Sequence, residues 1–186
     1  MKEIHVIKRS GEKTPLDLDK IHAMAEHACR GLAGVSESQV EMNANLQFFD
    51  GIKTSDIQEI LIRSANDLIS LESPNYQFVA ARLLLFSLRK AVYNGHPDGH
   101  PPLLEHVKKC VDKGVYDASI VAKYTEEEWE KLSSFMDHDR DMLFTYAGIR
   151  QVVDKYLVQD RSSGQIYETP QYMYMMVAAT LFQDDD

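Results

Sequence analysis

Hydrophobic and polar positions near the N-terminus predict a short β-hairpin. Residues 4–8 are largely apolar and lead into turn residues at Ser10 and Gly11. Alternation of apolar and polar positions resumes at Leu16 and Leu18. Two short runs of this kind on either side of a glycine turn are typical of paired antiparallel strands. We therefore expect a hairpin at the start of the chain.

Four helices are predicted after the hairpin, up to about residue 93. Each combines apolar residues spaced three or four apart with a recognisable start signal. Asp17 or Asp19 can cap the first helix, and Gly34 is expected to end it. The start signals of the other three are Ser36 with Gln39, Ser55 with Gln58, and Ser73 with Pro74 ahead of a helix over 76–91. The predicted fold class is mainly α, with a small β component (α+β).

The stretch NGHPDGHPP, residues 94–102, reads as a linker because it holds three of the six prolines. We therefore expect two domains, 1–94 and 95–186. The second should contain helices at 103–113 and 117–123 and one beginning with a capping box at Thr125. A second hairpin is predicted within 155–169, and a last helix begins at Pro170. That helix is apolar nearly all round and should be buried between other elements. Because the sequence stops at residues 184–186 just after it, we expect the protein to be cut short there, or the helix to pair with something absent.

Composition favours an ordinary folded domain and limits the classes of partner that we expect it to bind. Hydrophobic residues make up 44% of the 186, and the net charge is −9. An acidic surface opposes nonspecific binding to nucleic acid. No stretch is long enough for a signal peptide or a membrane span, so we expect a cytoplasmic protein with no membrane partner. Cys29 and Cys110 lack CxxC spacing and are expected to be reduced structural thiols.

Against this acidic background, four cations gather around the first hairpin and the first helix start: Lys8, Arg9, Lys13 and Lys20. Ammonium groups beside free backbone N–H groups at a helix N-terminus can bind phosphate. A solvated basic face explains the same pattern, and spacing alone does not separate the two interpretations. Thr54 and Lys90 are ambiguous in the same way, because both also suit ordinary helix ends.

Other polar or sulfur-rich clusters are expected to be structural. His96 and His100 lie in a Pro/Gly loop without a third ligand, so we expect surface residues and no metal site. In HDRD, residues 138–141, we expect an ion network in which Arg140 pairs with the neighbouring carboxylates. Trp129 and the methionines near the C-terminus are expected to pack in the core.

Several motifs, taken in order, resemble one known family. VIKRSG at 6–11, LDKI at 18–21, DGIKTSDI at 50–57 and NYQFVAARLLLFSLRK at 75–90 resemble the ATP-cone domain at the N-terminus of class I ribonucleotide reductase large subunits. The resemblance continues through KGVYD, YTEEE, HDRDMLFTYAG and KYLVQDRSSGQIYETPQ, which look like the segment between the cone and the catalytic barrel. It covers essentially the whole chain.

The resemblance implies an allosteric site for ATP as activator and, in many family members, dATP as inhibitor, each with Mg²⁺. Lys8 and Arg9 are expected at the phosphates, with Lys20 completing the phosphate pocket, and Asp17 at the base or sugar. The implied nucleotide-binding residues are Lys8, Arg9, Thr14, Pro15, Leu16, Asp17, Leu18, Asp19, Lys20, Ile21, Thr54, Ile57 and Lys90. The chain departs from the family pattern at Ser10, Thr14 and Pro15, which bears on whether dATP inhibits.

The family reduces ribonucleoside diphosphates with a thiyl radical and a cysteine pair, in deoxyribonucleotide synthesis for DNA replication. Neither Cys29 nor Cys110 matches those cysteines, so this chain is expected to hold no catalytic residue and no redox cofactor. The implied partners are the remaining barrel of the large subunit, the small radical-generating subunit and further large subunits.

Two alternatives remain open. A nucleotide-responsive transcriptional regulator carries a similar cone, but its expected zinc ribbon with paired CxxC motifs is absent here. The other alternative is a helical segment that binds no ligand, in which the convergence of the cations is coincidental.

Overall fold

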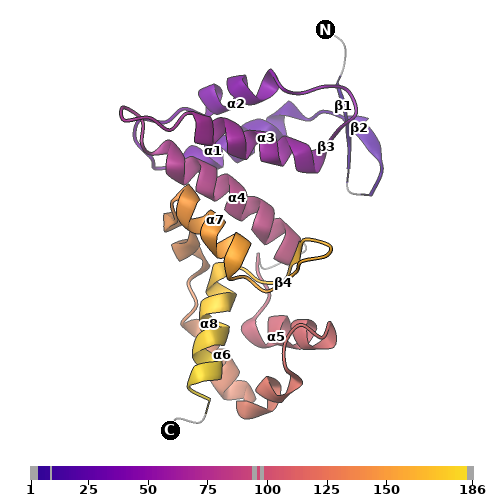
Figure 1. Ribbon diagram of the computed structural model, residues 1–186, viewed down its shortest axis with the longest axis vertical. Helices are drawn as coiled ribbons and strands as arrows, with labels where there is room; N and C mark the ends of the chain where they lie inside the picture. The colour runs from indigo at the N-terminus through magenta and orange to yellow at the C-terminus, as the bar shows by residue number, and fades with distance from the viewer. Residues whose placement is uncertain (1–3, 9, 94–95, 97–98, 184–186) are drawn as a thin grey trace. The chain divides into compact units, whose positions relative to one another are not determined.

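The computed structural model describes residues 4–8, 10–93, 96 and 99–183, and these are mainly helical (Figure 1). The chain divides into two compact units. The first contains the residues up to Ser87 together with Met142–Arg150, and the second contains Leu88–Asp141 and the residues from Gln151 onward. The predicted boundary within 94–102 falls partly outside the described residues, and the division at 94 stays a prediction.

A three-stranded sheet in the order β2-β1-β3 organises the first unit. β1 (His5–Ile7) pairs antiparallel with β2 (Lys13–Pro15), which confirms the predicted hairpin. The second strand lies earlier than the Leu16 and Leu18 alternation indicated. β3 (Ile52–Lys53) pairs parallel with β1 and was not predicted. Ile52 is 1% exposed, but two residues are too few for a strand period to be visible in the sequence.

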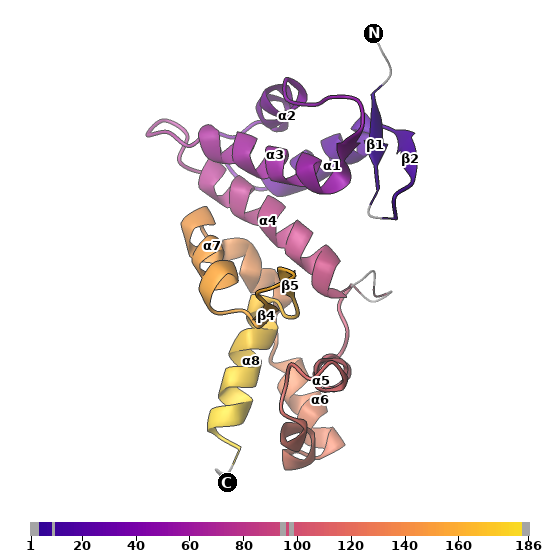
Figure 2. The ribbon, with the colours of Figure 1, turned by 45° about the vertical axis from the view of Figure 1, so that its right-hand side comes forward.

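The helices α1 (Leu18–Cys29), α2 (Glu37–Asn45) and α3 (Thr54–Asp67) follow the predicted order, and α4 (Tyr76–Tyr93) begins in this unit. α1, α2 and α3 lie on one side of the strands in both views (Figures 1 and 2). The core of the unit is formed by apolar side chains of the sheet and the helices, including Val6, Ile52, Ile21, Ala25, Val40, Leu61, Val79 and Leu83.

At several helix ends, contacts with residues far away in the sequence take the place of the predicted local capping residues. Asp17 caps α1 as expected, accepting a hydrogen bond from the Lys20 backbone N–H at 3.1 Å. α1 nevertheless ends at Cys29, before Gly34. Arg82 Nη1 donates to the backbone oxygens of Ala28 and Arg30 at 3.1 and 2.7 Å, and so satisfies carbonyls at this helix end.

Neither predicted capping box in the first unit forms. The side chain of Ser36 makes no cap hydrogen bond. The buried Tyr76 hydroxyl instead accepts from the Ser36 N–H at 2.9 Å and donates to Gln39 Oε1 at 2.6 Å. α3 starts at Thr54, directly after β3, so Ser55 lies within the first turn and does not cap it.

The second unit contains the end of α4, then α5 (Leu103–Asp112), the 3₁₀ helix η1 (Ala118–Lys123) and α6 (Glu126–Ser134). The capping box at Thr125 is present. The predicted second hairpin is β4 (Gln159–Asp160) with β5 (Gln165–Ile166), and α8 (Pro170–Leu181) begins at the predicted proline. The 3₁₀ helix η2 (His138–Leu143) and α7 (Tyr146–Lys155) were not predicted, and each contributes residues to both units.

Packing in the second unit confirms some expectations and leaves one untested. Trp129 is buried, and its indole N–H donates to the Val121 oxygen. α8 buries only one face: Tyr172, Met176 and Ala179 are buried, whereas Val177 and Leu181 are 53% and 72% exposed. The other face is thus exposed among the described residues, and the elements expected to cover it stay a prediction. Across both units, Cys29 and Cys110 are free, buried thiols. None of the helices in the described ranges combines the length and apolar character needed to cross a membrane.

Candidate nucleotide-binding site

The ends of β1 and β3 bring two predicted site residues together. The parallel register pairs Val6 with Ile52 and Ile7 with Lys53. Continued by one residue, this register sets Lys8 opposite Thr54, where both strands leave the sheet. The hairpin turn follows at once, with the Lys8 N–H donating to the Glu12 oxygen at 2.9 Å. The backbone pairing thus places a lysine and a threonine at one edge of the sheet.

The same edge holds a helix N-terminus without a side-chain cap. Lys53 occupies the N-cap position of α3 in an extended conformation, and its side chain makes no cap hydrogen bond. The leading N–H groups of a helix have no partner within the helix, and the helix dipole favours negative charge near them. A helix start of this kind, beside Lys8 and Lys53, is chemically suited to phosphate oxygens.

The lysines around the sheet are already paired with exposed carboxylates. Lys8 Nζ lies 2.9 Å from Glu12, Lys20 Nζ lies 2.8 Å from Asp17, and Lys13 Nζ lies 3.2 Å from Asp50. Exposed ion pairs contribute little free energy, because water screens them and the side chains lose freedom in forming them. A polyphosphate that offers several oxygens can therefore compete for these ammonium groups.

The start of α1 differs from that of α3 because a carboxylate caps it, whereas the Asp56 carboxylate in the first turn of α3 accepts from the hydroxyl of its neighbour Ser55. The Asp17 carboxylate accepts from the backbone and side chain of Lys20, and these hydrogen bonds hold the pKa of Asp17 below its ordinary value. Pro15 pairs with His5, and the Leu16 N–H donates to the Ile4 oxygen. α1 therefore begins near the opposite end of the sheet from Thr54.

The predicted residues thus fall at two ends of a short sheet, with Thr14 between them, opposite Val6. A three-residue strand spans roughly 10 Å. That separation suits an extended ligand with chemically different ends, such as a nucleoside triphosphate.

The remaining predicted residues are placed less directly. Ile21 and Ile57 are buried in the core, where they support the starts of α1 and α3. Leu18 and Asp19 are exposed on the first turn of α1. Arg9 lies outside the described residues. Lys90 belongs to the second unit, where it lines a cavity of about 640 Å³ together with Arg89, Tyr93, Gly99, His100, Met136, Asp137, His138 and Asp139.

Comparison with known proteins assigns both parts of the chain. The ATP cone domain family matches residues 4–91, and the family described as "Ribonucleotide reductase, all-alpha domain" matches residues 142–186. The chain is 50% identical over 179 residues to ribonucleoside-diphosphate reductase 1 subunit alpha of Escherichia coli (strain K12), which covers 96% of this chain and 23% of that protein. It belongs to the family of class I ribonucleotide reductase alpha subunits.

Other members of this family are similar over the same extent. The chain is 42% identical over 187 residues to the alpha subunit of Enterobacteria phage T4, covering 100% of this chain and 24% of that protein. It is 38% identical over 182 residues to the Helicobacter pylori alpha subunit, covering 98% and 22%. The chain spans about a quarter of the length of these relatives.

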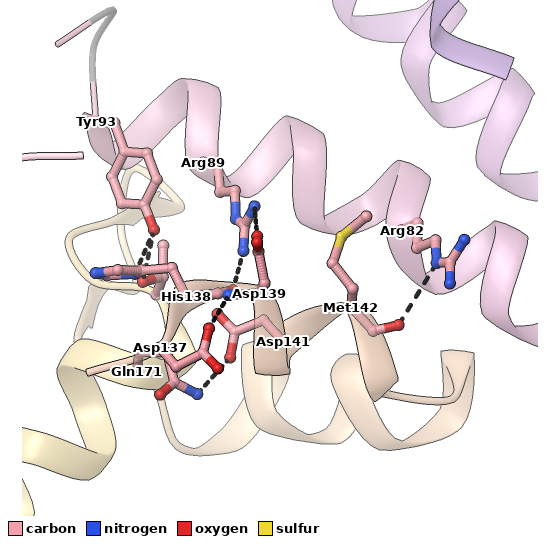
Figure 3. A network of polar contacts seen from close by, with 10 residues as sticks. Arg82, Arg89, Tyr93, Asp137, His138, Asp139, Asp141, Met142 and Gln171 are labelled. Carbon is pink, nitrogen blue, oxygen red and sulfur yellow. Dashed lines mark hydrogen bonds and ion pairs between the residues drawn. The ribbon is translucent and has the colours of Figure 1, made fainter. Parts of the chain in front are cut away.

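Outside the cone, a polar cluster is centred on His138 in the second unit (Figure 3). The Tyr93 hydroxyl lies 2.9 Å from His138 Nδ1 and 3.3 Å from Thr169 Oγ1. Arg89 Nη2 donates to the backbone oxygen of His138, and its Nη1 lies 3.8 Å from Asp139. Helix α4 of this reductase family member thus binds the HDRD segment through two side chains.

The predicted pairing within HDRD is wrong for Arg140. This residue lies 3.6 Å from Asp137, outside the motif, whereas Asp139 is paired with Arg89. Asp141 is buried, and its Oδ1 accepts from Gln171 Nε2 at 2.9 Å. Burial raises the pKa of Asp141 to about 6 and, with the nearby His100, lowers the pKa of His138 to about 4. The cluster is therefore held by hydrogen bonds from uncharged side chains as well as by ion pairs.

The two loop histidines differ from each other. His100 is exposed, as expected, and its ring lies 3.9 Å from that of His138. The His96 side chain is only 17% exposed and lies 3.6 Å from Glu105, so the expectation of a surface residue is wrong there. Within the described ranges, no group of three or more His, Cys, Asp or Glu residues is arranged to hold a metal ion.

Sequence reasoning missed Lys53 as a candidate site residue of the cone. Its position, one residue before a helix start inside the DGIKTSDI motif, was the available signal. β3 was not predicted, so nothing indicated that this lysine lies beside Ile7 at the sheet edge.

Proposed function

We propose that the first unit is an allosteric site that binds ATP as activator and dATP as inhibitor, with Mg²⁺, and so controls deoxyribonucleotide synthesis by a complete ribonucleoside-diphosphate reductase in the cytoplasm. The observation that supports the proposal is the parallel pairing of Ile7 with Lys53. Continued by one residue, this register would bring Lys8 opposite Thr54 at the start of α3, where the N-cap residue makes no side-chain cap hydrogen bond. The match of residues 4–91 to the ATP cone family supports the choice of ligand.

In this proposal the phosphates lie at the α3 edge of the sheet. Lys8 and Arg9 neutralise their charge, and the Thr54 hydroxyl donates a hydrogen bond to a phosphate oxygen. The first N–H groups of α3 face the phosphates with the positive end of the helix dipole. Lys20, which pairs with Asp17 at the other end of the sheet, is not assigned to this phosphate pocket, and Lys90, in the second unit, stays a sequence-based prediction. Mg²⁺, held by phosphate oxygens, reduces the remaining negative charge.

The other end of the nucleotide is assigned to the segment from Thr14 to Ile21, where Asp17 repels a phosphate but can accept a hydrogen bond from a sugar hydroxyl or a base N–H. ATP and dATP differ by the 2′-hydroxyl group. A site that hydrogen-bonds this hydroxyl discriminates against the ligand that lacks it, because a polar group is then left unpaired. Asp17 is the carboxylate that we propose for this role.

The output of the site requires the rest of an alpha subunit. We propose that bound nucleotide shifts the equilibrium between an active complex with the small radical-generating subunit and inhibited oligomers of alpha subunits, through different affinities for the two states. The catalytic barrel supplies the chemistry. In this chain, burial raises the pKa of both cysteine thiols to about 11, so neither is an accessible thiolate at neutral pH.

The test is calorimetric titration of the 186-residue chain with ATP and with dATP, each with Mg²⁺. We compare the wild type, a Lys8→Ala/Thr54→Ala variant, and Lys108→Ala, which removes an exposed cation from α5 in the second unit. The double variant should bind each nucleotide at least about tenfold more weakly, since two polar contacts to a charged ligand are lost. Lys108→Ala should match the wild type.

Equal binding by the double variant and the wild type would exclude the proposed location. If neither nucleotide binds the wild type, the segment is a helical part of the subunit without a ligand.

A further inference from the structure

The turn before β3 forms hydrogen bonds with the backbone of His5, the first residue of β1. The His5 N–H donates to Asp50 Oδ1 at 2.8 Å, and the Gly51 N–H donates to the His5 oxygen at 2.8 Å. Gly51 adopts φ +86°, a conformation that glycine reaches without steric cost. Both backbone hydrogen-bonding groups of His5 are thus taken by two consecutive residues, which lengthens the two-residue pairing of β1 with β3.

The same carboxylate also reaches β2. Asp50 Oδ2 lies 3.2 Å from Lys13 Nζ, and Oδ1 lies 3.2 Å from His5 Nδ1. The hydrogen bond from the His5 backbone and the contact with Lys13 hold the pKa of Asp50 below its ordinary value. One ionised side chain therefore contacts β1 and β2 and stands two residues before β3.

The contacts of His5 with the turn lie three residues before the proposed phosphate-binding residue on each strand. Lys8 follows His5 by three residues, and Thr54 follows Gly51 by three residues. Because β1 and β3 run parallel, a slip at the Asp50 end of the pairing displaces Lys8 relative to Thr54 at the other end.

We propose that Asp50 is a positioning residue for the nucleotide site: it fixes the register of the three strands and thereby the separation of Lys8 and Thr54. The inference rests on the proposed function of the first unit. The Asp50 side chain is 56% exposed, so its removal opens no buried cavity and should change the geometry of the site more than the stability of the unit.

The experiment compares Asp50→Ala and Asp50→Asn in the full 186-residue chain, with Asp112→Ala as control for the loss of one exposed negative charge. Asparagine keeps an oxygen for the His5 N–H but loses the charge that attracts Lys13. ATP titration with Mg²⁺ should show binding weakened about tenfold by Asp50→Ala and no more than about threefold by Asp50→Asn, as expected for loss of a charge-assisted hydrogen bond. Asp112→Ala should bind like the wild type.

A second readout separates positioning from general destabilisation. In ¹H–¹⁵N spectra recorded without nucleotide, the amide signals of Lys8 and Thr54 should shift in Asp50→Ala and return toward the wild-type positions in Asp50→Asn. The thermal midpoint should fall by no more than a few degrees in either variant. A loss of affinity that follows the thermal midpoint, with both amide signals unmoved, would overturn the inference.

The two proposals fail in different ways. If the wild type binds ATP and Asp50→Ala binds equally well, Asp50 has no positioning role and the proposed function stands. If the wild type does not bind, the proposed function fails, and unmoved Lys8 and Thr54 signals in Asp50→Ala would then refute the positioning role as well. Should Asp50→Ala not fold, Asp50→Asn, Lys13→Met and their double variant replace it: equal affinities and amide spectra in all three and the wild type contradict the inference.

Discussion

Asp141 brings a carboxyl group into the second unit with a hydrogen-bond partner for only one of its two oxygens within the described part of the chain. It is 2% exposed, and burial raises its pKa from 3.8 to about 6. The folded state therefore holds this proton more tightly than the unfolded chain does. Its contribution to stability is fully present below about pH 4 and is lost as the pH rises through about 6.

Asp141→Asn should consequently stabilise the protein at pH 7.5, by about 1–3 kcal/mol, because the amide keeps an oxygen for Gln171 and carries no charge to bury. The gain should shrink toward pH 4.5. Urea unfolding at both pH values measures it, with Asp139→Asn as the exposed control. An equal effect at the two pH values would show that burial of the charge is not its cause.

His106 is the opposite case, a base kept neutral. Its ring stacks on Tyr172 with centroids 3.8 Å apart, and burial lowers its pKa to about 3. Only the unfolded chain gains a proton there near pH 6. The stability from His106 is therefore present above its unfolded pKa of 6.5 and is lost as the pH falls below that value.

His106→Phe keeps an aromatic ring at Tyr172 and removes the titration. We expect the loss of unfolding free energy between pH 7.5 and pH 5 to be about 2 kcal/mol smaller in the variant than in the wild type. Urea unfolding at the two pH values gives this difference. His138 is also held neutral, so part of the acid sensitivity should remain. An identical pH dependence in the two proteins would contradict the assignment to His106.

Among the elements, α6 has the most complete start signal. Thr125 Oγ1 accepts from the Glu128 N–H at 3.3 Å, and the Glu128 carboxylate accepts from the Thr125 N–H at 2.7 Å. Thr125→Ala should cost about 1 kcal/mol of unfolding free energy, whereas Thr125→Ser should retain most of it. Chemical denaturation of the three proteins decides this, and equal loss in both variants would point to packing of the methyl group instead.

Comparison of helix starts shows why some elements were predictable. The α6 box was predicted correctly because its partners lie within three residues. The box expected at Ser36 does not form, because Tyr76, forty residues away, binds the same groups. Local spacing cannot reveal such a competitor.

The candidate site divides in the same way. Lys8 and Thr54 were found through their motifs, whereas Lys53 was missed and the contacts of Asp50 were not anticipated. Asp50 acts on a strand 45 residues away, through a parallel pairing only two residues long. Periodicity needs several residues to be recognised, so a strand of that length leaves almost no pattern.

At the scale of the whole molecule, the division into two units predicts which elements a bound nucleotide stabilises. Ligand at 100 times its dissociation constant stabilises the protein that binds it by about 2.7 kcal/mol. Hydrogen exchange with ATP and Mg²⁺ should slow in β1, β2, β3 and the first turns of α1 and α3, and stay unchanged in α5, α6 and α8. Protection confined to α5 and α6 would place the ligand elsewhere.

The parallel pairing of β1 with β3 also bears on the order in which the first unit folds. Closing the chain between His5 and Asp50 costs entropy before any contact repays it, whereas the helices between them form locally. The β1–β3 pairing should therefore form after the transition state. A ligand that binds the finished sheet then slows unfolding and leaves the folding rate unchanged. Stopped-flow measurements with and without ATP test this, and acceleration of folding would contradict it. Nucleotide concentration would thus set the lifetime of the folded unit, and have no influence on how quickly a new chain reaches it.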